Sequence, residues 1–270
     1  MTRRRLLNIV KKEWRLLFTD LNTALLVTLV PLVIVVQGLL YVWLAAKFGG
    51  ESILASPVFG TAIETLVRNT PGLAGSSDDL KLLVLLLTQF NFFILLIPTM
   101  IAISVATFSI VDEKVTGSLE ALLATPVRTW ELLLGKALAG AIPAVIVTWV
   151  YAVISLAIMR VVGWREAVGF VSNANWYLML FLVAPAVAVL SFMLGVAGSS
   201  RAKDARSAQN LVLLIIFPVF ALIGIQVTGV VWFTPLLTVV LALVVGIADA
   251  VTLRIAVRLF SRESILTGWH

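Results

Sequence analysis

The chain has 270 residues, of which 61% are hydrophobic and only 13% are charged, about half the charged fraction of an ordinary soluble domain. It has no cysteine and a single histidine, His270, which argues against disulfides, thiol chemistry and a histidine-based metal site. We therefore expect an all-α polytopic membrane protein, in which the formal net charge of +6 has to be explained by where the cations lie along the chain.

Residues 1–19 predict a helix that lies on the membrane surface. Apolar side chains recur at helical spacing through Leu6, Val10 and Trp14, whereas cations such as Lys11 fall mainly on other faces. Because the apolar residues are periodic and not continuous, the segment is not typical of a secretory signal. Two roles stay open for it: a simple anchor, or a helix that also touches a cytoplasmic partner.

Six apolar runs that follow are long enough to cross a hydrocarbon core about 30 Å thick. They cover residues 21–46, 82–111, 132–159, 176–198, 211–227 and 230–250 of a single transmembrane domain, 1–270. An even number of spans puts both termini on the same side of the membrane. Residues 112–131 then form a loop on that side, and residues 47–81, rich in Pro, Gly, Ser and Asp, form the longest loop on the other side.

The cations divide unevenly between the two sides. Five of the 20 Lys and Arg residues fall on the side opposite the termini: Lys47, Arg68, Lys81, Arg160 and Arg165. The other 15 lie on the side of the termini, in the two terminal segments, in and beside the 112–131 loop, and in a second loop at 201–206. The positive-inside rule therefore places both termini and these loops in the cytoplasm of a cell inner or plasma membrane. The basic charge is explained by topology and calls for no nucleic acid partner.

Asp249 is the main acid that falls inside a predicted span, at the cytoplasmic end of the last one. Arg254 is close enough in sequence to neutralise it, which favours a structural ion pair. An intramembrane carboxylate is also a functional hypothesis, so a proton or ion site stays open.

A charged island at residues 112–136 separates two long apolar runs. It holds seven formal charges: Asp112, Glu113, Lys114, Glu120, Arg128, Glu131 and Lys136. Burying the island in lipid would cost roughly 20 kcal/mol, at about 2.5–3.5 kcal/mol per charge at mid-bilayer. We therefore expect it at or outside the membrane surface.

The interior of the island has the pattern of a short amphipathic helix. Leu119, Leu122 and Leu123 show the i, i+3, i+4 spacing of one helical face. Gly117 allows a tight entry, and Thr125 ends the helix because the residue before Pro126 disfavours the α conformation. An apolar helical face on an aqueous loop indicates docking to another molecule.

Recognisable catalytic chemistry is absent from the sequence. No stretch matches the phosphate-binding pattern G-x-x-x-x-G-K-[ST], because Gly135-Lys136 is followed by Ala137. No Ser-His-Asp constellation is possible with His270 as the only histidine. We expect no enzyme activity and no cofactor bound by this chain.

The island resembles the cytoplasmic loop of ABC transporter permeases of the ABC-2 type. The matching residues are Glu113-Lys114, Gly117-Ser118-Leu119-Glu120, Leu122-Leu123, Thr125-Pro126 and Gly135-Lys136. Residues 201–209 and 258–266 are similar to two further, weaker motifs of that family, and the resemblance covers the whole length.

The resemblance implies the membrane subunit of an ATP-driven exporter. It would pair with a second permease subunit, as a homodimer or heterodimer, and couple to separate ABC ATPase subunits that hold ATP and Mg. The loop between spans two and three would be the coupling helix, with contact residues Glu113, Lys114, Gly117, Leu119, Glu120, Leu122, Leu123, Thr125 and Pro126. Two other functions are weighed against it: an ion- or proton-coupled secondary transporter, which favours internal repeats and midplane charges, and a lipid-modifying membrane enzyme. The substrate is left open.

Overall fold

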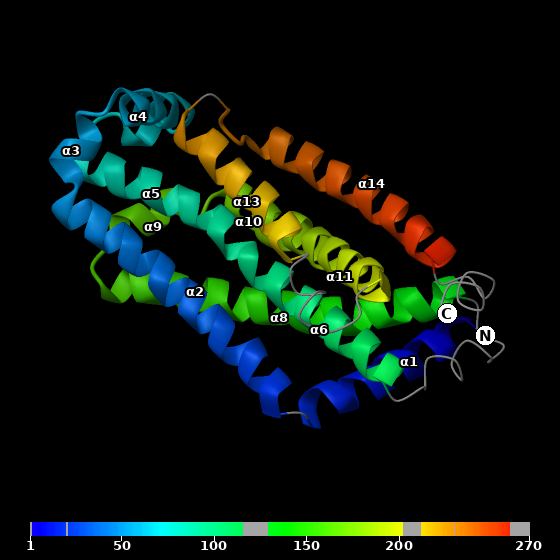
Figure 1. Ribbon diagram of the computed structural model, residues 1–270. Coiled ribbons are helices and arrows are strands. Elements are labelled where there is room, and N and C mark those ends of the chain that lie inside the picture. The colour runs from blue at the N-terminus through cyan, green and yellow to red at the C-terminus, as the bar shows by residue number, and fades with distance from the viewer. Residues whose placement is uncertain (1, 20, 116–128, 202–211, 230, 260–270) are drawn as a thin grey trace.

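The structure is a computed structural model that describes residues 2–19, 21–115, 129–201, 212–229 and 231–259 (Figure 1). Every regular element in these ranges is helical. The longer helices are α1 (Thr2–Thr19), α2 (Leu21–Phe48), α5 (Asp78–Ile94), α6 (Leu96–Val115), α8 (Thr129–Val161), α11 (Ala184–Arg201), α13 (Val212–Val227) and α14 (Pro235–Leu259). Short helices connect them: α3 (Gly50–Leu54), α4 (Pro57–Asn69), η1 (Pro71–Leu73), α9 (Arg165–Val171), α10 (Ala174–Leu178) and η2 (Met179–Val183). The expected all-α class is confirmed.

Five helical stretches among the described residues are long and apolar enough to cross a membrane. They are Val27–Phe48, Asp78–Ile110, Thr129–Val161, Ala174–Ser199 and Pro235–Arg258. Within α13, the predicted fifth span, the apolar stretch Phe217–Val227 is shorter, and the count of six stays a prediction. The molecule is a multi-pass membrane protein.

The structure refines two of the expected segments. The last span was expected at 230–250, but α14 begins at Pro235. Proline suits the first helical position, and the hydroxyl of the preceding Thr234 accepts a hydrogen bond from the Leu237 N–H (3.4 Å). It then continues past the apolar run to Leu259. The connection at residues 47–81, rich in turn residues, contains α3, α4 and η1, with Pro57 starting α4; its position on the outer side stays a prediction.

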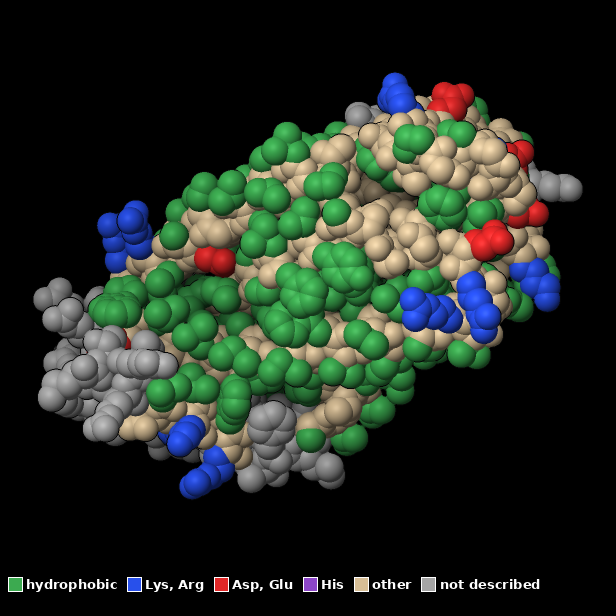
Figure 2. Space-filling view, turned by 180° about the vertical axis from the view of Figure 1, so that it is seen from behind, with side chains coloured by type: hydrophobic (Ala, Val, Ile, Leu, Met, Phe, Trp, Pro, Cys, Tyr) green, Lys and Arg blue, Asp and Glu red, His purple; other side chains and the backbone are tan. Residues whose placement is uncertain are grey.

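The helices form an elongated bundle with two distinct ends (Figure 1). At one, which we call the loop end, α1 starts, α6 ends, α8 begins and α14 ends; at the other, the connector end, lie α3, α4 and α9. The face in Figure 2 carries hydrophobic side chains over its broad middle, with Lys and Arg toward the two ends. This distribution fits a membrane crossing along the long axis.

The second membrane crossing is broken in its middle by a proline. Pro98 has no N–H for the carbonyl of Ile94, four residues earlier. The chain adjusts at Leu95, whose N–H bonds to the carbonyl of Phe92 (3.0 Å), three residues back. The crossing therefore consists of two helices, α5 and α6, joined at this break.

A second irregularity precedes α11. The N–H of Ala184 bonds to the carbonyl of Met179, five residues back, which makes η2 a π-helical turn. In the same i to i+5 pattern, the Leu180 carbonyl would pair with residue 185, but Pro185 has no N–H. This carbonyl instead accepts a hydrogen bond from Trp149 Nε1 on α8 (3.0 Å). The indole thus satisfies a carbonyl that a proline leaves free.

Helices α6, α8 and α11 pack closely in the centre of the bundle. An added Cβ at Gly140 on α8 would lie 2.5 Å from the ring of Phe192 on α11, and one at Gly195 on α11 would lie 2.8 Å from Ala106 on α6. Small residues therefore set the distance between these helices, as is common where helices meet in membranes.

Candidate functional site

The predicted coupling helix falls mostly in a part of the chain that the structure does not describe. Gly117, Leu119, Glu120, Leu122, Leu123, Thr125 and Pro126 lie outside the described residues. Glu113 and Lys114 lie in the last turn of α6, with side chains that are not described. The structure does describe the two helices that carry the loop, because α6 runs to Val115 and α8 begins at Thr129.

Helix α1 lies against the first turns of α8, next to the loop. The side chain of Ile9 packs on Gly135, where an added Cβ would lie 3.1 Å from it. One turn further along, Trp14 Nε1 donates a hydrogen bond to the carbonyl of Ala139 (2.9 Å). This contact pairs segments more than a hundred residues apart.

The Trp14 bond has a specific backbone cause. Pro143 lies inside α8, so the carbonyl of Ala139, four residues earlier, receives no backbone hydrogen bond from it. The indole of Trp14 occupies this acceptor, as Trp149 does for Leu180. Helix α1 is thereby attached at the point where α8 is weakest.

A buried polar cluster joins α1, α6 and α8 at the loop end. Lys136 Nζ of α8 lies 3.3 Å from Glu13 Oε1 of α1 and donates to Ser109 Oγ of α6 (2.7 Å). Ser109 Oγ in turn donates to Glu13 Oε2 (3.0 Å). We call Glu13, Ser109 and Lys136 the loop-end triad.

The triad is shielded from solvent. The side chain of Lys136 is 1% exposed and that of Glu13 8% exposed. Taking one partner away from such a pair is costly, because it leaves the other charge buried without compensation. The triad therefore holds the three helices in one arrangement.

The C-terminal part of the charged island is buried against other helices. Lys136 and Glu131 are only 1% and 5% exposed, and the position of the island at or outside the membrane surface stays a prediction. The sequence argument counted the cost of an uncompensated charge in lipid, whereas Lys136 meets a carboxylate and a hydroxyl supplied by other helices. The Gly135-Lys136 pair thus belongs to the α1 contact.

Glu13 is a site residue that sequence reasoning missed. It is the single acid in α1, among several Lys and Arg residues, and it follows Ile9 by four positions on the face that meets α8. A lone acid in a basic helix, and a lone Lys within a run of small apolar residues, were the available signals. Nothing local connects them, because 123 residues separate the two.

The expected ion pair of Asp249 with Arg254 is not among those that the described residues form. Asp249 Oδ1 is buried and has no hydrogen-bond partner in the part of the chain that the structure describes. Thr252 donates only to the backbone carbonyl of Asp249 (3.0 Å).

An apolar groove of about 770 Å³ lies between α2, the α5–α6 break and α13. Residues that line it include Val33, Tyr41, Phe93, Met100, Phe220 and Ile223. Its polar element is a hydrogen bond from Gln37 Nε2 to Tyr41 Oη (2.6 Å). Such a groove suits an apolar or amphiphilic occupant.

These features define a class: a multi-pass helical membrane protein in which the N-terminal helix α1 is bonded to both helices that carry one loop. The sequence model of the ABC-2 family transporter protein matches residues 7–241. The chain therefore belongs to the ABC-2 family, the membrane permeases of ABC transporters, and is a transport component. No curated protein and no solved structure matches the chain.

Proposed function

We propose that the protein is the membrane subunit of an ATP-driven exporter. It forms the translocation path as a dimer and binds separate ATPase subunits, which hold ATP and Mg, through residues 112–131. The loop end faces the cytoplasm. Family membership supports this proposal, and the observation that carries it is the loop-end triad, which links both helices of the loop to α1.

The triad suggests how a push on the loop travels. Each of the two helices contains a proline further from the loop, Pro98 in the first turn of α6 and Pro143 within the continuous α8. The parts between the loop and these prolines, 99–115 and 129–142, are joined to each other and to α1 by the triad. ATP-driven closure of the ATPase pair would tilt them together as one body about the two prolines.

The apolar groove is the part of the path that we assign to this subunit. It borders the α5–α6 break through Phe93 and Leu96, so a tilt of α6 about Pro98 changes its width. Its lining favours amphiphiles or hydrophobic compounds as cargo. The outward direction of transport is taken from the family resemblance.

Replacing Leu122 and Leu123 by Asp tests the coupling proposal. We expect the double variant to reach the membrane at the normal level but to lose co-purification with the ATPase and substrate-stimulated ATP hydrolysis, because the apolar docking face is gone. The matched control is Val58→Asp, which places the same charge at an exposed position on α4 at the connector end.

Unchanged coupling in the Leu122→Asp/Leu123→Asp variant would overturn the assignment of the loop. Transport that continues in vesicles without nucleotide would overturn the ATP-driven function itself and would favour an ion- or proton-coupled transporter. The two results are separable, because the first concerns one interface and the second concerns the energy source.

A further inference from the structure

A cavity of about 330 Å³ lies at the connector end, bordered by α4, α5, α9 and the residues that lead into α14. Its polar lining consists of the amides and hydroxyls of Asn69, Thr70, Thr88, Asn91, Asn173, Asn175 and Thr234. Three aromatic residues complete the wall: Phe170, Trp232 and Phe233. No described residue that lines it is charged. The volume is at the small end of the range for ligand sites, about 300–1,000 Å³.

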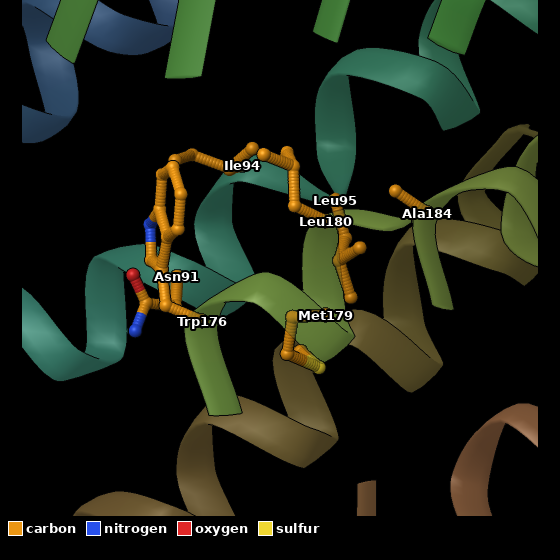
Figure 3. A pocket seen from close by; sticks show the side chains of 7 residues that line it. All are labelled: Asn91, Ile94, Leu95, Trp176, Met179, Leu180 and Ala184. Carbon is orange, nitrogen blue, oxygen red and sulfur yellow. The ribbon is translucent and has the colours of Figure 1, made fainter. Parts of the chain in front are cut away.

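The inner wall of the cavity holds an amide with unmet hydrogen-bonding capacity. Asn91 of α5 is only 7% exposed, and its Oδ1 has no partner in the described part of the chain. Figure 3 shows its amide beside the indole of Trp176, where it also borders a smaller pocket further inside. The Oδ1 atom itself is closed off from solvent, so an occupant of the cavity that Asn91 lines can bond to this amide through its NH2 end.

Two further side-chain amides are each held by a hydrogen bond at only one of their two ends. Asn69 Nδ2 donates to the carbonyl of Thr65 (2.7 Å), and Asn175 Oδ1 accepts from the hydroxyl of Thr238. The other end of each amide stays available, as an acceptor on Asn69 and a donor on Asn175. Asn173 differs, because both ends of its amide bond to nearby backbone, at Phe170 and Trp176.

This combination of groups defines the ligand chemistry. Neutral amides that offer both donors and acceptors match hydroxyl groups, which do the same. The faces of Trp232 and Phe170 offer apolar surface for the C–H side of a ring. A phosphate, a carboxylate or an ammonium group would be buried here without a counter-charge, which is costly.

We propose that this cavity binds a neutral saccharide group, either as a free sugar or as the headgroup of a glycolipid in the adjacent leaflet. Asn91, Asn69 and Asn175 bond its hydroxyls, and Trp232 packs on its ring. The site stands on the cavity alone and does not depend on the coupling of the loop to an ATPase.

The test uses the full chain in phosphatidylcholine nanodiscs. Saturation-transfer NMR with methyl β-maltoside measures binding of the free sugar, and native mass spectrometry of nanodiscs that contain monoglucosyl diacylglycerol measures retention of the headgroup. Binding in the first arm identifies a soluble saccharide, and binding in the second alone identifies a glycolipid. Methyl phosphocholine serves as the charged comparison.

Asn91→Leu keeps the size of the side chain and removes the amide. We expect it to weaken binding of the sugar about tenfold, the loss of one hydrogen bond to a buried group. Trp232→Leu, at a less buried position, should weaken binding similarly. If Asn91→Leu does not fold, the binding measured for Trp232→Leu tests the proposal. Trp43→Leu, an exposed tryptophan of α2 outside the cavity, should leave binding unchanged.

The proposal is overturned by absence of binding in both arms, by equal binding of methyl phosphocholine, or by variants that bind like the unmodified protein. Absence of binding would indicate a cavity filled by water, equal binding of methyl phosphocholine a site without preference for neutral groups, and unaffected variants a sugar bound elsewhere on the protein. At about 30 Å³ per molecule of liquid water, the volume would hold roughly ten.

Discussion

Removal of the lysine of the loop-end triad should release α1 from the bundle. Lys136→Met keeps the length of the side chain but leaves the carboxylate of Glu13 buried, with 8% of its side chain exposed. Ser109 Oγ loses a donor at the same time. Removing one partner of a buried pair costs about 3–5 kcal/mol, which corresponds to roughly a hundredfold to a few thousandfold in an equilibrium constant.

When α1 separates from α8, the unpaired Glu13 carboxylate becomes hydrated. The substitution should therefore lower the free energy of this local separation. Hydrogen–deuterium exchange of the α1 amides in nanodiscs measures this opening directly. We expect exchange to accelerate by up to the factor above in Lys136→Met and in Glu13→Gln, while the middle of α8 changes little. Lys12→Met is the matched control, because this lysine is 51% exposed and its Nζ lies 3.9 Å from the same carboxylate. A charge that solvent reaches in this way contributes less, about 0–1 kcal/mol.

The double variant Glu13→Gln/Lys136→Met gives the sharpest test. It removes both charges, and the amide oxygen that replaces the Glu13 carboxylate still accepts the hydrogen bond of Ser109, so α1 should be held more firmly than in either single variant. Faster exchange in the double variant than in both singles would refute the reasoning. So would single variants that behave like Lys12→Met.

Two further contacts of α8 can be probed, each with a test substitution and a comparison substitution. Trp14→Phe should lower the free energy of unfolding by about 1–3 kcal/mol, because a backbone carbonyl loses its donor. Pro143→Ala in the same background should recover part of this loss by restoring a backbone N–H; a melting temperature with no recovery would contradict it. Gly140→Ala should destabilise by about 1–3 kcal/mol through overpacking on Phe192. Gly246→Ala, with nothing within 4 Å of the added Cβ, should instead be neutral or stabilising. Equal melting temperatures for the Gly140→Ala and Gly246→Ala variants would contradict close packing of α8 on α11 at Gly140.

Much of the fold could be predicted from local composition. Apolar runs identify membrane helices because each residue contributes to the transfer free energy almost independently of its neighbours. Composition was less informative about where the individual helices begin and end. Residues 47–81 contain many turn residues but are mostly helical, and α14 starts at Pro235 and not at the beginning of the apolar run, because proline and a capping threonine determine where the helix begins.

Only part of the candidate site could be predicted from the sequence. The loop motif suggested the residues that we propose for docking, and Gly135-Lys136 was included in that motif. The role of Lys136 was not predictable, since α8 is apolar on nearly all sides and its periodicity does not say which helix it meets. Asn91 falls within a predicted span as a polar residue, but only the structure shows that its amide lines a cavity.

The amino-acid sequence by itself determined the class of the protein, its helical content and the family to which it belongs, because these depend on sums over neighbouring residues and on one contiguous motif. Only the tertiary structure decided that Glu13 and Lys136 form a pair, that Trp14 serves the carbonyl freed by Pro143, and that amides from separate helices share one cavity. These contacts bridge long stretches of chain, and their free energy arises from burial and hydrogen bonding that exist only once the helices are packed together.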